Sequence, residues 1–156
     1  LPYHVTWVDN RQSEFPERVN TNIRKVLSDD VKGFINSRPP GEFYIIMTHQ
    51  HALDFEILEA ILKRNDAKYV GLIGSQTKWR QFKSRFQHKG YEADFYKSVN
   101  CPVGFEALSG KRPMEVAVSI AAQIMMIHSN NEANTTNVHT GVDLEGFKVL
   151  ANSLKI

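Results

Sequence analysis

Two continuous apolar runs constrain the fold of this chain more than any other feature. They are Phe43–Met47 and Tyr69–Ile73, and each is followed by apolar residues at helical spacing. A strand without polar alternation is typical of a parallel sheet that is covered on both faces. The alternation of strands and helices predicts a Rossmann-like, doubly wound α/β fold, with a mainly parallel sheet in three α/β/α layers.

The other segments continue this alternation. We expect further strands at Tyr3–Val8, Ile23–Leu27 and Phe95–Val99. We expect helices from a cap at Ser28 or Asp29 to about Asn36, from Leu53 to Arg64, from Ser75 to a stop at Gly90, and from Pro113 to about His128. The predicted organisation is one N-terminally incomplete domain over residues 1–128, then a polar linker and a short C-terminal helix over residues 129–156.

Composition narrows the class of protein. A length of 156 residues with 42% hydrophobic content suits one domain with its own core. The formal net charge of +2 gives no electrostatic reason for a nucleic-acid partner. The longest apolar stretch, Val116–Ile127, is too short to cross a bilayer, and the single cysteine, Cys101, excludes an intrachain disulfide. We therefore expect a cytoplasmic protein that binds neither membranes nor nucleic acid.

The segment Gly71–Arg80 (GLIGSQTKWR) is the strongest candidate for ligand binding. Ligands of doubly wound sheets bind at the carboxyl ends of the strands, and Gly74 directly follows the second apolar run. A glycine turn lets the backbone approach a ligand, and the first N–H groups of the next helix face an anion. Ser75, Thr77 and Lys78 add hydroxyl groups and a positive charge. The alternative is an ordinary capped helix with a solvated basic face.

Asp9 ends the first predicted strand, where a dinucleotide-binding fold places the acid that holds a ribose. Arg11 is close enough in sequence to contact a phosphate. The alternative is that Asp9 only initiates a turn. The glycine-rich turn that normally accompanies such an acid is absent, and we expect it upstream of Leu1.

Thr48, His49, His51 and Asp54 follow the first apolar run and form the most suggestive metal pattern. Two imidazoles and a carboxylate at a strand end are able to hold zinc or iron. A histidine pair at this spacing is a weak signal, however. Contact with an organic ligand, or capping of the next helix, are the competing interpretations.

Cys101 follows the last predicted strand. Lys111, Arg112 and a helix amino terminus nearby would lower the pKa of its thiol, and such a thiolate would be able to touch molybdenum or carry sulfur. The competing interpretation is a small buried residue that ends a strand. Lys111 is also a candidate anion contact, although Gly104–Lys111 does not have the spacing of a P-loop.

The helix Met114–Ile127 is apolar almost all round, so it must be covered on more than one side. We expect it to pack on the sheet and also to form the interface of a homodimer. Coverage by the C-terminal segment is the alternative.

Four segments occur in order and together resemble the C-terminal domain of the xanthine dehydrogenase accessory protein family, known as XdhC-like or CoxI-like. They are VTWVDNR, MTHQHALDFEILEAIL, YVGLIGSQTKWRQF and CPVGFEALSGKRPMEVAVSIAAQ. The resemblance covers roughly Tyr3–Ile127. It implies an accessory protein that binds molybdenum cofactor (molybdopterin), protects it during sulfuration by a cysteine desulfurase, and delivers it to xanthine dehydrogenase.

The same resemblance implies where the cofactor would lie. Its phosphate would rest against the Gly74–Lys78 turn, with its pterin near Asp9 and Thr48–His51, and Cys101 near the metal or its exchangeable sulfur. The family's first strand and glycine-rich turn are missing here. In the usual strand order, their omission leaves a slot between Tyr3–Val8 and Phe43–Met47, with unpaired backbone groups on either side.

Two other functions stay open at this point. The fold and Asp9 are compatible with an NAD(P)-binding oxidoreductase, although fold alone does not imply function. A metal-dependent hydrolase that uses His49, His51 and Asp54 is a weaker alternative.

Overall fold

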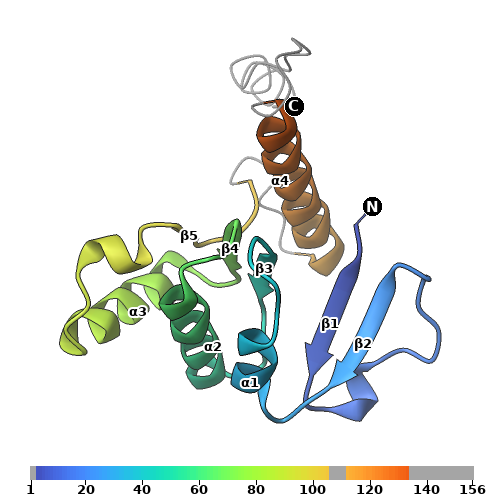
Figure 1. Ribbon diagram of the computed structural model, residues 1–156, viewed down its shortest axis with the longest axis horizontal. Coiled ribbons are helices and arrows are strands. Elements are labelled where there is room, and N and C mark those ends of the chain that lie inside the picture. The colour runs from blue at the N-terminus through green and yellow to red at the C-terminus, as the bar shows by residue number, and fades with distance from the viewer. Residues whose placement is uncertain (1–2, 106–111, 134–156) are drawn as a thin grey trace. The chain divides into compact units, whose positions relative to one another are not determined.

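The structure is a computed structural model that describes residues 3–105 and 112–133 of the chain. The chain divides into two compact units, Leu1–Val103 and Gly104–Ile156, and Figure 1 shows their elements. Strands and helices alternate along the first unit, and the strand pairs are parallel. The predicted Rossmann-like α/β fold is therefore confirmed.

The elements follow the predicted order with small shifts at their ends. In the first unit they are β1 (Val5–Asp9), a 3₁₀ turn at Gln12–Glu14, β2 (Ile23–Leu27), α1 (Val31–Asn36), β3 (Phe43–Ile46), α2 (His51–Arg64), β4 (Tyr69–Leu72), α3 (Gln76–His88), a 3₁₀ turn at Ala93–Tyr96, and β5 (Val99–Asn100). The second unit contains α4 (Pro113–Ala133).

Strands β3, β4 and β5 form a parallel sheet in which β4 is central. Phe43 pairs with Tyr69 in the first ladder and Val70 pairs with Val99 in the second. The register continues past the strand ends, because the Ile73 N–H donates to the Ile46 carbonyl at 2.9 Å. All four residues of β4 are buried, as the apolar run predicted. The carboxyl ends of β3 and β4 therefore lie side by side at one edge of the sheet.

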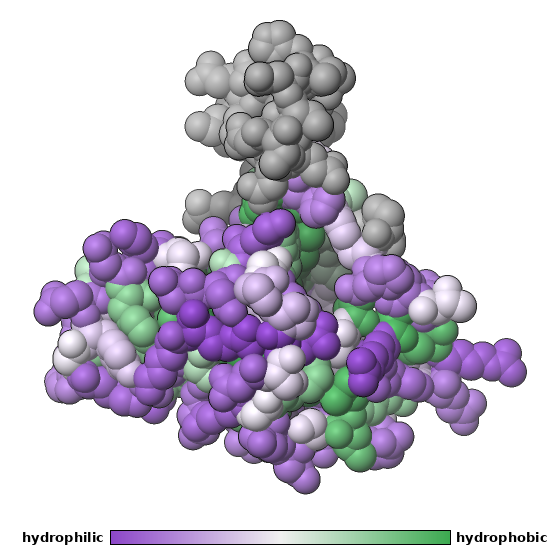
Figure 2. Space-filling model, in the orientation of Figure 1, coloured by the Kyte–Doolittle hydropathy of each residue, from purple (hydrophilic) through white to green (hydrophobic). Residues whose placement is uncertain are grey.

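Strands β1 and β2 form a separate, two-stranded parallel sheet with Val5 opposite Ile23 (Figure 1). Among the described residues, no ladder joins β1 to β3. The side chains of this small sheet are only partly covered. Leu27 is 55% exposed and Val5 is 42% exposed, and apolar surface is visible over β1 and β2 in Figure 2.

The core of the first unit lies where α2 and α3 pack together. Phe55 of α2 stacks on Phe86 of α3 with ring centroids 4.5 Å apart. Leu58 and Ile61 continue the buried stripe of α2, and Phe82 continues that of α3. These residues recur at three- and four-residue intervals, so the helical spacing in the sequence identified the buried faces correctly.

Side-chain caps fix where two of the helices begin. The Asp30 carboxylate accepts a hydrogen bond from the Gly33 N–H at 2.8 Å, so α1 is capped by Asp30 rather than by Ser28 or Asp29 as predicted. The Ser75 hydroxyl accepts from the Lys78 N–H at 3.2 Å and caps α3. Both arrangements satisfy a helix N–H group that has no acceptor within the helix.

The segment Phe95–Val99 is not the strand that its aromatic and β-branched residues predicted. Residues 93–96 form a 3₁₀ turn, and only Val99 and Asn100 pair with β4. The reason is tertiary: the ring of Phe95 stacks on that of Tyr91 with centroids 4.0 Å apart, and Tyr96 is buried against Phe86. Packing on α3 therefore overrides the strand propensity of this segment.

In the second unit, polar residues of α4 hold the backbone that precedes the helix. Ser119 accepts from the Phe105 N–H at 2.7 Å, and Gln123 accepts from the Gly104 N–H at 2.8 Å. These two residues are the polar interruptions of the apolar stretch Val116–Ile127. Helix α4 continues to Ala133, five residues past its predicted end, and no helix in the described part of the chain is long and apolar enough to cross a membrane.

The predicted domain boundaries stay untested. The first unit ends after Val103, inside the domain that we predicted over residues 1–128. Residues 134–156, which contain most of the predicted linker and the C-terminal helix, lie outside the described residues. The homodimer interface through Met114–Ile127 likewise stays a prediction.

We expect the α2–α3 core to dominate the stability of the first unit. Leu58 is fully buried, so Leu58→Ala should lower the free energy of unfolding by about 3 kcal/mol through lost burial and a residual cavity. The matched change Leu27→Ala, at an exposed position of β2, should lower it by less than about 0.5 kcal/mol. Urea denaturation followed by circular dichroism measures both, and equal losses would show that the core lies elsewhere.

Candidate functional site

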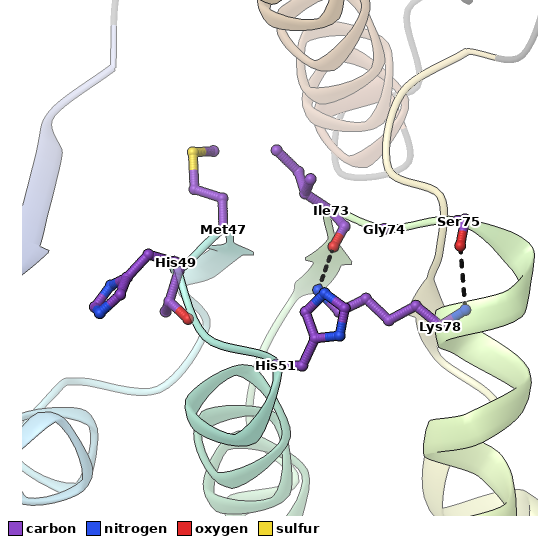
Figure 3. Close-up of a pocket in the computed structure, with 8 residues that line it drawn as sticks. Met47, His49, His51, Ile73, Gly74, Ser75 and Lys78 are labelled. Carbon is purple, nitrogen blue, oxygen red and sulfur yellow. Dashed lines mark hydrogen bonds between the residues drawn. The ribbon is translucent and has the colours of Figure 1, made fainter.

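A pocket opens at the carboxyl ends of β3 and β4, where the strand-end rule places ligands (Figure 3). Its cavity volume is about 250 Å³. It is lined by Met47, Thr48, His49, His51, Ile73, Gly74, Ser75 and Lys78. The two loops that follow the strands thus supply the walls, and the first turns of α2 and α3 supply His51 and Lys78. The structure brings together most of the residues predicted from these two segments.

A buried ion pair lies at the base of this pocket. The Lys78 ammonium donates to Asp54 Oδ2 at 2.5 Å and to the Ile73 carbonyl at 2.7 Å. The other oxygen of Asp54 accepts from the Thr48 N–H at 2.8 Å. The side chains of Asp54 and Lys78 are 1% and 8% exposed. Both residues are candidate ligand contacts from the sequence, and the structure pairs them with each other.

Gly74 is required by the side chain of Lys78. A Cβ atom on Gly74 would lie 2.5 Å from Cδ of Lys78, which is closer than real Cβ contacts allow. The aliphatic part of the Lys78 side chain therefore passes directly beside Gly74. Figure 3 shows the positions of both residues. The sequence suggested that a ligand needed this space, and the structure assigns it to Lys78.

The two histidines of the pocket lie apart from any metal-ligand set. Among the residues that the structure describes, no group of three His, Cys, Asp or Glu side chains is placed to hold a metal ion. In Figure 3 the imidazole of His49 points away from Gly74 and Ser75. The Thr48 hydroxyl is engaged locally, since it donates to the Gln50 carbonyl at 2.9 Å. The carboxylate of Asp54 is already held by Lys78, so the predicted hydrolase triad is not assembled.

Asp9 and Arg11 pair with each other at the end of β1. The Arg11 guanidinium donates to both carboxylate oxygens of Asp9 at 3.0 Å, and the Arg11 backbone N–H donates to one of them. These hydrogen bonds hold the pKa of the Asp9 carboxyl below its ordinary value, with a smaller contribution from the charge of His49. Asp9 is thus an ionised acid at a strand end whose oxygens are already occupied.

Comparisons with known proteins identify the family and the fold of this chain. The sequence profile described as the XdhC Rossmann domain matches residues 1–124. The chain belongs to the XdhC Rossmann domain family. A crystal structure described as a xanthine dehydrogenase from Bacillus halodurans superposes with a TM-score of 0.65 at 24% sequence identity, over 81% of this chain and 36% of that one. This chain thus spans little more than a third of that protein, and the likeness shows a shared fold. No curated protein matches in sequence.

In this XdhC Rossmann domain, Cys101 lies beside the Gly74 loop with a neutral thiol. Its Sγ atom is 3.8 Å from the Gly74 carbonyl oxygen. Burial raises the pKa of the Cys101 thiol to about 11, and the nearby charge of Lys78 offsets this only in part. Of the two interpretations of Cys101, the partly buried residue that ends a strand fits this raised pKa, and the thiolate with a lowered pKa does not, because burial outweighs the charge of Lys78.

Besides Asp9, Arg11, Asp54 and Cys101, Thr77 also lies outside the pocket lining. Thr77 is on the first turn of α3, where its hydroxyl accepts from Arg80 at 3.2 Å. Lys111 lies outside the described residues. Conversely, sequence reasoning missed Met47 and Ile73, which line the pocket from the ends of β3 and β4. Met47 is 57% exposed, and its place as the last residue of the apolar run, at the carboxyl end of the strand, was the available signal.

We expect the alkylation rate of Cys101 by iodoacetamide to follow its raised pKa. The rate is proportional to the thiolate fraction, so it should rise about tenfold per pH unit between pH 8 and pH 10 without levelling off. The chain unfolded in urea should level off above about pH 9, as an ordinary cysteine does. Mass spectrometry of the labelled protein measures both rates, and a plateau near pH 9 in the folded chain would contradict this assignment.

Proposed function

We propose that this chain binds molybdenum cofactor at the carboxyl edge of β3 and β4, and supports its sulfuration and its insertion into xanthine dehydrogenase. Membership of the XdhC Rossmann domain family supports an accessory role toward xanthine dehydrogenase. The observation that carries the proposal is the pocket formed by the Thr48–His51 and Gly74–Ser75 loops at the strand ends. A cysteine desulfurase is the partner that sulfuration would require.

The amino terminus of α3 is the best anchor for the phosphate of the cofactor. The first N–H groups of an α-helix have no acceptor within the helix, and they point outward along its axis. Ser75 uses its hydroxyl to cap the Lys78 N–H, so the preceding N–H groups of Gln76 and Thr77 are the ones that would meet an anion. The partial positive charge of the helix terminus favours the same ligand.

The size of the pocket limits what it encloses. Its volume of about 250 Å³ is below the ~300–1,000 Å³ of sites that enclose a small molecule. The pocket would therefore hold the phosphate end of the cofactor. The pterin would extend along the strand ends toward Thr48–His51 and Asp9, where amide and imidazole groups are available for hydrogen bonds.

Cys101 would serve this function as a packing residue and a neutral neighbour of the Gly74 loop. A thiol with a pKa of about 11 is a poor nucleophile at neutral pH, because the thiolate is the reactive form. We therefore place the sulfur-transfer chemistry on the desulfurase. The role of this chain is to hold the cofactor, exclude water from one end of it, and present the other end.

One observation favours a second candidate, an NAD(P)-binding domain. Asp9 ends β1 at the position of the ribose-binding acid in dinucleotide-binding folds, and it is ionised. Arg11 occupies both of its oxygens, so a ribose hydroxyl would have to displace a guanidinium hydrogen bond. Isothermal titration with NADPH separates the two functions, since saturable binding together with turnover would favour the oxidoreductase.

The anchor at α3 is tested by removing one N–H group from its first turn. Gln76→Pro deletes a donor while keeping the helix, since proline suits the first helical position and Ser75 already has the extended backbone that a following proline requires. Loss of a hydrogen bond to a charged group is worth about 1.5–3 kcal/mol, so the affinity for molybdenum cofactor should fall about 10- to 100-fold.

The matched control is Gln76→Ala, which removes the same side chain and keeps the N–H group. It should bind the cofactor like the unchanged protein in anaerobic gel filtration with fluorescence detection of the pterin. Equal binding by Gln76→Pro and Gln76→Ala would show that the phosphate does not bind at the amino terminus of α3. Absence of cofactor co-elution from the unchanged chain would overturn the proposed function itself.

A further inference from the structure

Lys78 is the basic residue that the sequence suggested for contact with an anion, but its geometry serves another purpose. Its ammonium is directed to Asp54 at 2.5 Å and to the Ile73 carbonyl at 2.7 Å, away from the helix terminus that carries it. The side chain is 8% exposed. An ammonium in this position already has a full-charge partner, so a phosphate would have to compete with a buried carboxylate for it.

The same pair connects four separate pieces of the chain. Asp54 belongs to the first turns of α2, and its second oxygen holds the Thr48 N–H at the end of β3. Lys78 belongs to the first turn of α3, and its ammonium holds the Ile73 carbonyl at the end of β4. Both loops that line the pocket are thus hydrogen-bonded to one ion pair.

Gly74 belongs to this arrangement because it has no side chain in the space that the Lys78 side chain occupies. Three stem atoms of Lys78, Cγ, Cδ and Cε, lie within 3.3 Å of the position that a Cβ on Gly74 would occupy. The stem has little freedom to move aside, because its ammonium is fixed at the far end by Asp54 and Ile73. The loop at the end of β4 is therefore shaped around Lys78.

We propose that Asp54 and Lys78 are positioning residues that fix the Thr48 and Gly74 loops at the spacing required for ligand binding, and that Lys78 does not contact the anion of the ligand. The part of this proposal that concerns the ligand rests on the proposed function. The part that concerns the loops does not, because it follows from contacts within the chain.

Cys101 provides a test of the loops that needs no ligand. Its Sγ atom is 3.8 Å from the Gly74 carbonyl, so opening of the Gly74 loop should expose the thiol. In the whole chain, Asp54→Asn and Lys78→Met should each raise the iodoacetamide labelling rate at pH 8 by about tenfold or more, because each leaves the other partner buried without its ion pair. An unchanged rate in both variants would overturn the proposal.

The double variant shows whether the two residues act as a unit. Asp54→Asn combined with Lys78→Met should label no faster than the faster single variant, since both changes break the same contact. Multiplied effects would show that the residues act independently, against the proposal. The control is the exposed ion pair of Lys32 and Glu56, 3.1 Å apart, where Lys32→Met and Glu56→Gln should leave the rate unchanged.

Gly74→Ala tests the same loop with both charges in place, so it needs no charge variant, and an unchanged labelling rate in it would also contradict the proposal. This change adds one methyl group and keeps both charges, and it should raise the labelling rate by displacing the Lys78 stem. In the variant Gly74→Ala/Lys78→Ala the stem is gone, so adding the methyl group to Lys78→Ala should produce no further increase. A methyl group that raises the rate equally with and without the stem would contradict the role of Lys78 in shaping this loop.

Binding measurements on the same variants distinguish positioning from direct contact, because the two roles predict opposite effects of Asp54→Asn on the affinity for phosphate. If Lys78 held the anion, Asp54→Asn would strengthen binding of inorganic phosphate, because a competing negative charge is removed. If the pair positions the loops, Asp54→Asn should weaken binding about as much as Lys78→Met does. Lys78→Arg keeps the charge and should retain more affinity than Lys78→Met. Stronger binding by Asp54→Asn would overturn the positioning role.

The two proposals fail in different ways. If the unchanged chain binds neither molybdenum cofactor nor phosphate, the proposed function fails while the cysteine labelling still decides whether Asp54 and Lys78 hold the loops. If the chain binds the cofactor but the labelling rates do not respond to the ion pair, the proposed function stands and the positioning role is rejected.

Discussion

The buried ion pair between Asp54 and Lys78 is the interaction on which the geometry of the candidate site depends. Such pairs add little net stability, because the loss of hydration offsets most of their attraction. Here Thr48 and Ile73 add hydrogen bonds to the pair, and the centroid of the Phe82 ring lies 5.6 Å from the ammonium. In our proposal the pair therefore acts mainly on conformation, because movement of either residue away from the other would leave a buried charge unpaired.

The fold was predictable because it rests on periodic burial. The apolar runs at β3 and β4 and the aromatic residues along one side of α3 each extend over several residues. One polar or small residue within such a pattern does not change the element that it predicts. Element ends were less predictable because they depend on one hydrogen bond, as at Asp30. The segment Phe95–Val99 shows the limit of local propensity: stacking of Phe95 on Tyr91 decided its conformation, and no local pattern encodes that contact.

The candidate site was predictable in location and much less in chemistry. The strand-end rule selected the loops at Thr48 and Gly74, which the structure brings together. The rule says nothing about which polar groups neutralise each other. Asp54 and Lys78 are 24 positions apart in sequence, and nothing in their spacing indicates a pair. Cys101 illustrates the same limit, because nearby basic residues suggested a thiolate while burial, which the sequence does not display, determined a neutral thiol.

In a site whose buried cation is already paired, an anion would be recognised mainly by the orientation of N–H donors and less by a full positive charge. The terminus of α3 offers about half a positive charge and a few oriented N–H groups, which suffices to orient a phosphate without binding it irreversibly. Under the proposed function the chain would have to release the cofactor again, and an unpaired lysine in the pocket would oppose that release. The pairing of Lys78 with Asp54 is therefore compatible with transfer: the ion pair makes the loops rigid, and the ligand meets only the weaker field of the helix.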